Sequence, residues 1–322
     1  MKNIIYLIVI LSATLLVSCY KEEPLTQTPA ENADRYTFPQ GSNSYDVAAN
    51  EVFKKFGVKI IYKEYRDVDF NLSWTNPAVG KIGYDIPQEQ EKDAVEFIVN
   101  NIFSFLTPDV TKKILLPFFY VADSICQKTI TSNATTTLES VAAYPYIYNG
   151  LDYWSFCWNG ASQWTKLNGT LISSSLPTQR PVTSHQKFYR RGVMLKEIFK
   201  RAVANGNIKI PDGFANGFDF TTAIKYAVGT EDDVNYYKKR GFPGQMINVN
   251  NFDLTQLTLV SRTGPMQIFT DYLHLCMRYQ ADSIEILFPK AKYPLIHNKY
   301  PIVIDYMKNT YDIDLSLIAK KP

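Results

Sequence analysis

Two lysines and a glutamate stand at a spacing associated with metal chemistry in the run Lys196-Glu197-Ile198-Phe199-Lys200. On a helix, Lys196 and Lys200 lie one turn apart on the same face. With histidine at both positions the run would be HExxH, in which two imidazoles bind zinc and the glutamate acts as general base. A lysine ammonium, however, has three hydrogen-bond donors and no lone pair for a metal.

Zinc binding through these lysines would require both of them to lose a proton. At pH 7 this costs about 4.6 kcal/mol for one lysine of ordinary pKa and about 9 kcal/mol for two. A good structural zinc site provides roughly 10–16 kcal/mol, so little binding energy would remain. The sequence therefore predicts a helix that binds no zinc. Without a metal-bound water to deprotonate, Glu197 is expected to form an ion pair with Arg201 or Lys200.

The element that positions these residues is a predicted helix at residues 183–206. Thr183 and Gln186 have the spacing of a capping box, and Asn205-Gly206 provides a left-handed stop. Apolar residues recur along it at intervals of three and four, which predicts one buried face. They are Leu195, Ile198, Phe199 and Ala202.

The chain begins with the pattern of a lipoprotein signal peptide. Lys2 precedes an apolar run, residues 4–17, that is too short to span a bilayer. Residues 16–19, Leu-Val-Ser-Cys, resemble the bacterial lipobox, which predicts cleavage after residue 18 and lipid attachment at Cys19; the alternative is an ordinary signal. Residues 21–23, Lys-Glu-Glu, resemble the signal that exports Bacteroidetes lipoproteins to the outer face of the outer membrane. We therefore expect an outer-membrane lipoprotein on the cell surface.

The rest of the chain has the pattern of a tether and one domain. Residues 19–43 are polar and proline-containing, which favours a flexible tether, and residues 44–322 are expected to form a single globular domain. The net charge of +3 gives no basis for a nucleic-acid partner. Three further cysteines lack CxxC spacing, which leaves one disulfide or, as we expect, buried free thiols. They are Cys126, Cys157 and Cys276.

Hydrophobic periodicity places mixed strands and helices first and helices later, which is an α+β order. Loops are expected at residues 129–140, 173–181 and 241–251. The predicted strands are 58–65, 115–125 and 152–158, and the other predicted helices are 46–56, 88–105, one starting at 107, 222–228, 230–239, 265–280, 282–288, 302–310 and 315–319.

Residues 144–164 are rich in tyrosine and tryptophan. They could form a platform on which sugars stack. The interpretation that we favour is a buried edge strand with paired aromatic side chains.

The chain resembles the substrate import-associated zinc metallohydrolase lipoproteins of Bacteroidetes, which are found with SusC/SusD-type nutrient importers. Residues 56–63 resemble the first strand of that family, and residues 194–200 fall where it has its HExxH helix. Residues 267–271, Gln-Ile-Phe-Thr-Asp, fall where it has an acidic helix that gives the third ligand, and residues 305–315 resemble its closing segment.

The resemblance implies a zincin (metalloprotease)-like α+β fold, with a small N-terminal sheet and helices followed by a mainly helical C-terminal half. It assigns Glu197 to the position of the general base, vestigial here. It assigns Lys196, Lys200, Gln267 and Asp271 to degenerate metal-ligand positions, so that no cofactor is expected although the family binds zinc. We then expect both lysines to face the 265–280 helix, with Asp271 pairing with an ammonium where a metal would lie.

Three functions are compatible with these features. The first is a surface lipoprotein that binds a peptide, a glycan or an importer of the SusC/SusD type during nutrient uptake and is catalytically inactive. The second is an active metallohydrolase with non-standard ligands, for which His185 and His274 could meet across two helices although neither they nor His297 have ligand spacing. The third is an accessory glycan-binding lipoprotein that uses its aromatic residues.

Overall fold

The computed structural model describes residues 35–66, 68–71, 80–160, 162–175, 179–257 and 264–321. The chain divides into a short unit, Met1–Thr37, and a compact unit, Phe38–Pro322, to which all elements named below belong. The predicted signal peptide and Cys19 lie outside the described residues. Within those residues, no helix combines the length and the apolar character that a membrane crossing needs.

The first of two sheets has four strands in the order β1-β3-β7-β6. β1 (Lys59–Ile61), β3 (Phe118–Ala122) and β7 (Tyr153–Cys157) are parallel, and β6 (Tyr146–Ile147) pairs antiparallel with β7. Every residue of β7 is buried, as expected for a parallel strand with both faces covered.

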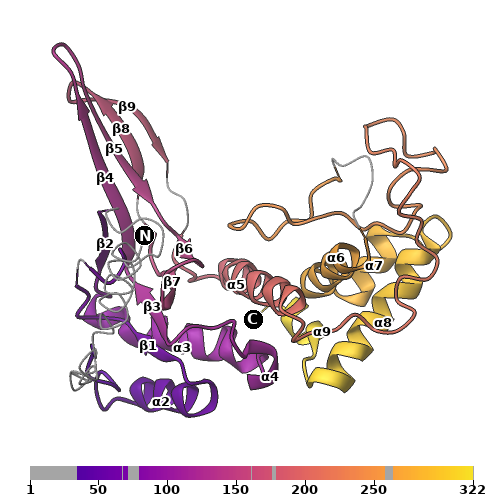
Figure 1. Cartoon of the computed structure of the whole chain (residues 1–322), viewed down its shortest axis with the longest axis horizontal. Coiled ribbons are helices and arrows are strands. Elements are labelled where there is room, and N and C mark those ends of the chain that lie inside the picture. Colours follow the sequence, from indigo (N-terminus) through magenta and orange to yellow (C-terminus); the bar gives the residue numbers. More distant parts are fainter. Residues whose placement is uncertain are drawn as a thin grey trace, which may run out of the picture. The chain divides into compact units, whose positions relative to one another are not determined.

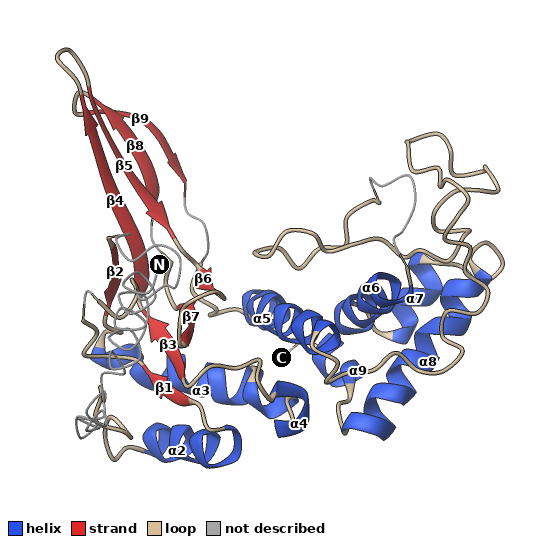
Figure 2. Cartoon of the chain, viewed as in Figure 1, coloured by secondary structure: helices blue, strands red, loops and turns tan. Residues whose placement is uncertain are grey.

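The second sheet is antiparallel and has five strands in the order β2-β4-β5-β8-β9. β4 and β5 form a hairpin that turns at Asn133, so the prediction of a loop at 129–140 is wrong. Threonine has a high strand propensity, which outweighed the loop signal of Ser and Asn here. Figure 2 shows the long strands of this sheet in red. The strands are β2 (Lys81–Tyr84), β4 (Ser124–Ser132), β5 (Thr137–Ala143), β8 (Gln163–Leu167) and β9 (Thr170–Ser175).

The first helix agrees closely with its prediction, and the second does so only in part. α2 (Ser44–Phe56) begins with a capping box and ends at Gly57, whose φ of +71° is left-handed. The predicted 88–105 helix is divided into three pieces, and a short helix follows at residue 108. Residues 38–43, assigned above to the tether, include Gln40, whose amide hydrogen-bonds with the main chain at residues 62 and 63. The pieces are η1 (Gln88–Gln90), α3 (Glu91–Asn101), η2 (Phe103–Phe105) and α4 (Pro108–Thr111).

The predicted central helix is present as α5 (Ser184–Ala204), with both of its predicted ends. The Thr183 hydroxyl accepts from the Gln186 amide at 3.2 Å, and the Gln186 side chain accepts from the Thr183 amide at 3.0 Å. Gly206 has the left-handed φ of +78°. The four predicted apolar residues are buried, and so are 13 of the 21 residues of the helix, which makes it a central rather than a surface element.

The C-terminal part is helical only from residue 265 onward (Figure 1). The predicted helices at 222–228 and 230–239 are wrong, because this region consists of turns with isolated bridges at Lys225–Tyr236 and Gln245–Thr255. The Asp219 carboxylate accepts from the amides of residues 221 and 222, so a side chain satisfies donors that a helix would use. The four helices are α6 (Pro265–Arg278), α7 (Ala281–Leu287), α8 (Pro294–Tyr311) and α9 (Leu315–Ala319).

The structure is a mixed architecture of helices and sheets, in agreement with the predicted α+β class at that level. It has more strands and fewer late helices than predicted. One continuous core joins the first sheet to α2, α3, α5 and the C-terminal helices. The aromatic residues from Tyr146 to Trp158 are buried, as the favoured interpretation predicts, but β7 lies between β3 and β6 rather than at an edge, and Tyr144 and Trp164 are half-buried. The three described cysteines are free thiols, and Cys157 and Cys276 are buried.

The close approach of α5 to the 248–252 loop gives a testable prediction. A Cβ at Gly192 would lie 2.2 Å from the ring of Phe252, which is fully buried. Helix propensity alone would make Gly192→Ala stabilising by about 1 kcal/mol. We expect it to destabilise the protein by about 1–3 kcal/mol in urea unfolding, because the ring has no space to move into.

A double-mutant cycle provides the control for this prediction. In a Phe252→Ala background the clash is absent, so Gly192→Ala should become neutral or stabilising. Stabilisation by Gly192→Ala alone would show that Phe252 does not pack against α5.

Candidate functional site

α5 carries three buried cations, Arg190, Arg191 and Lys196, and each donates hydrogen bonds to main-chain carbonyls outside the helix. Arg190 donates to the carbonyl of Gln179 at 2.8 Å and also to that of Cys157. Arg191 donates to the carbonyl of Ile318 at 2.7 Å and also to that of Lys320. Peptide oxygens thus replace part of the hydration of each guanidinium group, whereas the buried Nε of each arginine has no hydrogen-bond partner among the described residues.

Lys196, which the resemblance assigns to a degenerate ligand position, is 1% exposed. Its ammonium donates to the carbonyls of Asn248 and Asn251, each at 2.5 Å. Burial lowers the pKa of Lys196 to about 8, so the group remains mostly charged at pH 7. These two hydrogen bonds connect the ammonium to the 248–251 loop, a partner that the sequence did not predict.

Glu197 is 5% exposed and makes the ion pairs that the sequence predicts. Its Oε1 accepts from Arg201 Nε at 3.0 Å, and its Oε2 lies 4.0 Å from Lys200 Nζ. The side chain of Lys200 is 53% exposed, so the two lysines of the run occupy different environments. The carboxylate is engaged by cations of its own helix.

The degenerate positions on α6 are also divided between the surface and the interior. Gln267 is exposed, whereas Asp271 is 1% exposed and accepts from the Gln267 amide at 3.2 Å. His274, one turn further, is 2% exposed. Burial and the nearby Lys196 ammonium lower the pKa of His274 to about 3, so its imidazole is neutral at pH 7.

The histidines do not come together. His185 is exposed and stacks near Tyr189, and it precedes Lys196 by 11 residues, or about 16 Å of helix. His274 lies beside Lys196, and the His297 ring interacts with Glu285 and the Phe288 carbonyl. A shared site of His185 and His274 is therefore excluded by their positions.

The residues at the HExxH positions do not fit a zinc ion. The ammonium of Lys196 is hydrogen-bonded to two carbonyls, and Glu197 faces two cations. Over the described ranges, no three or more His, Cys, Asp and Glu side chains are grouped as metal ligands.

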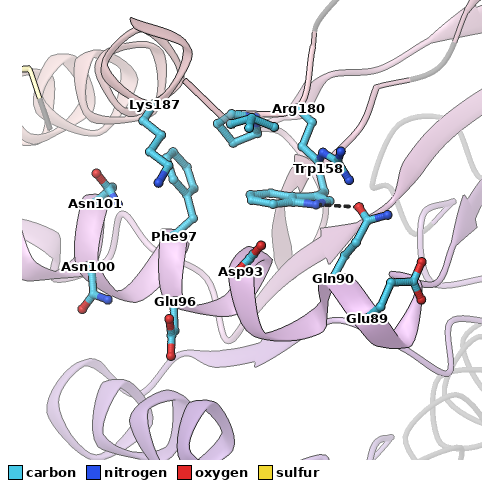
Figure 3. A pocket seen from close by; sticks show the side chains of 12 residues that line it. Glu89, Gln90, Asp93, Glu96, Phe97, Asn100, Asn101, Trp158, Arg180 and Lys187 are labelled. Carbon is cyan, nitrogen blue, oxygen red and sulfur yellow. Dashed lines mark hydrogen bonds between the residues drawn. The ribbon is translucent and has the colours of Figure 1, made fainter. Parts of the chain in front are cut away.

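A separate cavity of about 600 Å³ lies between α3 and the segment that leads into α5 (Figure 3). One wall comes from η1 and α3, where Glu89, Asp93 and Glu96 recur at intervals of three and four residues and so share one side. The opposite wall contains Arg180 and, in the first turn of α5, Lys187.

Buried aromatic residues line the same cavity. Phe97 and Trp158 are each 3% exposed, and Trp158 Nε1 donates to Gln90 Oε1 at 3.0 Å. Trp158 directly follows β7, so the cavity lies at the carboxyl end of a parallel strand, a common position for ligand sites. Arg190 holds the carbonyls of Cys157 and Gln179, which connects α5 to two edges of the cavity.

Sequence reasoning missed this cavity because it contains no motif. The acidic side of the predicted 88–105 helix could have been recognised from its spacing. The pairing of that side with residues 180–187 depends on tertiary packing, which no local pattern indicates.

No protein-family model and no curated protein sequence matches this chain. Among solved structures, the chain is similar to a protein from Bacteroides caccae described as a "putative zinc-binding metallo-peptidase". The two share 10% sequence identity with a TM-score of 0.37, and the similarity covers 87% of this chain and 91% of that one.

The burial of His274 predicts a pH dependence of stability. The pKa of His274 is about 3 in the folded protein and 6.5 for an unperturbed histidine. Between pH 3 and pH 6.5, His274 is therefore protonated in the unfolded chain and neutral in the folded protein. The free energy of unfolding should therefore fall as pH drops below 6.5, by about 1.4 kcal/mol per pH unit from this group. In His274→Leu that contribution should be absent when urea unfolding is measured from pH 7 to pH 4.5.

His185→Gln is the matched control, since His185 is exposed and its replacement should leave the pH dependence of the wild type unchanged. Equal slopes in the wild type and His274→Leu would mean that His274 is protonated in the folded protein.

Proposed function

We infer that this chain is a surface lipoprotein that binds its ligand without hydrolysing it, on a scaffold resembling a zinc metallopeptidase. The observation that supports this most strongly is the ammonium of Lys196, which is buried and bound by the carbonyls of Asn248 and Asn251. At the position of a first zinc ligand, this chain has a side chain that holds a loop.

The free-energy cost of making Lys196 a zinc ligand has a different origin from the cost expected for a lysine of ordinary pKa. With a pKa of about 8, its neutralisation at pH 7 costs about 1.4 kcal/mol rather than 4.6. A metal would, however, take the lone pair and turn the side chain away from the two carbonyls, so that the ammonium would lose both of its hydrogen bonds to the loop. Glu197 would also have to leave Arg201.

The compartment and partners are proposed from the N-terminal sequence. A lipid on Cys19 and the Lys-Glu-Glu run support an anchor on the outer face of the outer membrane, beside an importer of the SusC/SusD type. The glycan-binding alternative loses much of its support, because most of the aromatic residues that suggested it are core residues and only Tyr144 and Trp164 are half-buried. A ligand would instead enter the cavity between α3 and α5.

The absence of zinc chemistry at α5 is tested by metal content. Purified protein incubated with zinc and then dialysed should contain far less than one zinc per chain and should cleave no peptide in an assay of the same sample. About one zinc per chain that disappears in Glu197→Gln or Asp271→Ala would contradict the proposal. Zinc that persists in both variants would lie elsewhere.

The anchor is tested by replacing the lipidated residue. Cys19→Ala should move the protein from the membrane fraction to the soluble fraction, since a tether without acyl chains has no membrane affinity. Proteinase added to intact cells should degrade the wild type. Unchanged fractionation would refute the anchor, and protection from proteinase would refute the surface location.

A further inference from the structure

The cavity between α3 and α5 has walls of opposite charge that do not neutralise each other. In Figure 3, Arg180 and Lys187 lie across the cavity from Asp93. Glu89 and Glu96 add negative charge to the α3 wall. Over the described residues, these five side chains form no ion pair or hydrogen bond, although other charged groups of the chain do, such as Arg201 with Glu197.

Asp123, a charged neighbour of Arg180, lies outside the cavity lining. Burial raises the pKa of Asp123, and both the hydrogen bond from Asn159 and the Arg180 guanidinium oppose that rise. Asp123 thus weakens the positive field of Arg180, whereas the Lys187 side chain forms no ion pair with any described residue. The wall from α5 therefore keeps at least one cation for a ligand.

We propose that this cavity binds a zwitterion: a short peptide whose free ammonium lies toward α3 and whose free carboxylate lies toward Lys187 and Arg180. The proposal rests on the binding role inferred above and gives it a ligand class. Because the acids of the lining outnumber its bases by one, a basic side chain in the peptide should strengthen binding.

The size and the remaining lining agree with a peptide better than with a sugar. A volume of about 600 Å³ is typical of sites for small ligands. Asn100 and Asn101 can hydrogen-bond to peptide groups. The rings of Phe97 and Trp158, at 3% exposure each, offer no free face on which a pyranose could stack.

The test is calorimetric titration of the full chain, purified in detergent, with the tripeptide Ala-Lys-Ala and four related probes. These are its N-acetylated form, its C-amidated form, Ala-Glu-Ala and maltotriose. Ala-Lys-Ala should bind most tightly. Blocking either terminus should weaken binding about tenfold or more, Ala-Glu-Ala should bind more weakly still, and maltotriose should not bind.

Substitutions in each wall test which end of the peptide, the ammonium or the carboxylate, lies against that wall. Asp93→Asn should weaken binding of Ala-Lys-Ala and of its amidated form, but have little effect on the acetylated form. Lys187→Gln should weaken binding of Ala-Lys-Ala, which has a free carboxylate, and leave binding of the amidated form unchanged. A merely structural role of either residue would weaken all probes alike. Lys54→Gln is the matched control, because Lys54 is exposed on α2 and pairs with Glu51 outside the cavity.

The outcomes separate this inference from the proposed function. Absence of Ala-Lys-Ala binding at millimolar concentration, equal affinity for all peptides, or binding of maltotriose alone would overturn the inference and leave the non-hydrolytic role standing. Binding that follows the predicted pattern but is accompanied by cleavage of the peptide would support the cavity and overturn the non-hydrolytic role.

Discussion

Burial of positive charge on α5 is the constraint on which the arrangement of the other segments depends. A charged group removed from water is tolerated only when oxygen atoms replace its hydration. Arg190, Arg191 and Lys196 obtain those oxygens from main-chain carbonyls at residues 157 and 179, at residues 318 and 320, and at residues 248 and 251. Each cation therefore fixes the position of a segment far away in the sequence.

The same constraint connects the scaffold to the site. Arg190 holds the end of β7 and the segment before α5, which places Trp158 and Arg180 at the cavity. Lys196 holds the 248–251 loop, and Phe252 packs against Gly192 one turn earlier on α5. Through its buried cations, α5 thus organises the segments around it.

The sequence was sufficient to predict α5 and the poor zinc-binding properties of its lysines. The capping box, the glycine stop and the apolar spacing of α5 are local features, and the poor ligand properties of lysine follow from its side chain alone. The burial of Arg190, Arg191 and Lys196 could not be predicted, because charged residues are expected at the surface unless partners are known. Those partners lie up to 129 residues away along the chain. Local signals also misled at residues 129–140 and 222–239, where Thr, Ser, Asn and Asp are compatible with strands, turns and helix starts alike.

The central claim is the proposal that α5 binds no zinc because the Lys196 ammonium holds the 248–251 loop. The most direct measurement is anomalous diffraction at the zinc edge from crystals of the protein grown or soaked with zinc. The account predicts no anomalous peak at α5 and an ammonium of Lys196 that still donates to the carbonyls of residues 248 and 251. A zinc peak bonded to Glu197, Asp271 or His274, with the Lys196 side chain turned away from the loop, would contradict it.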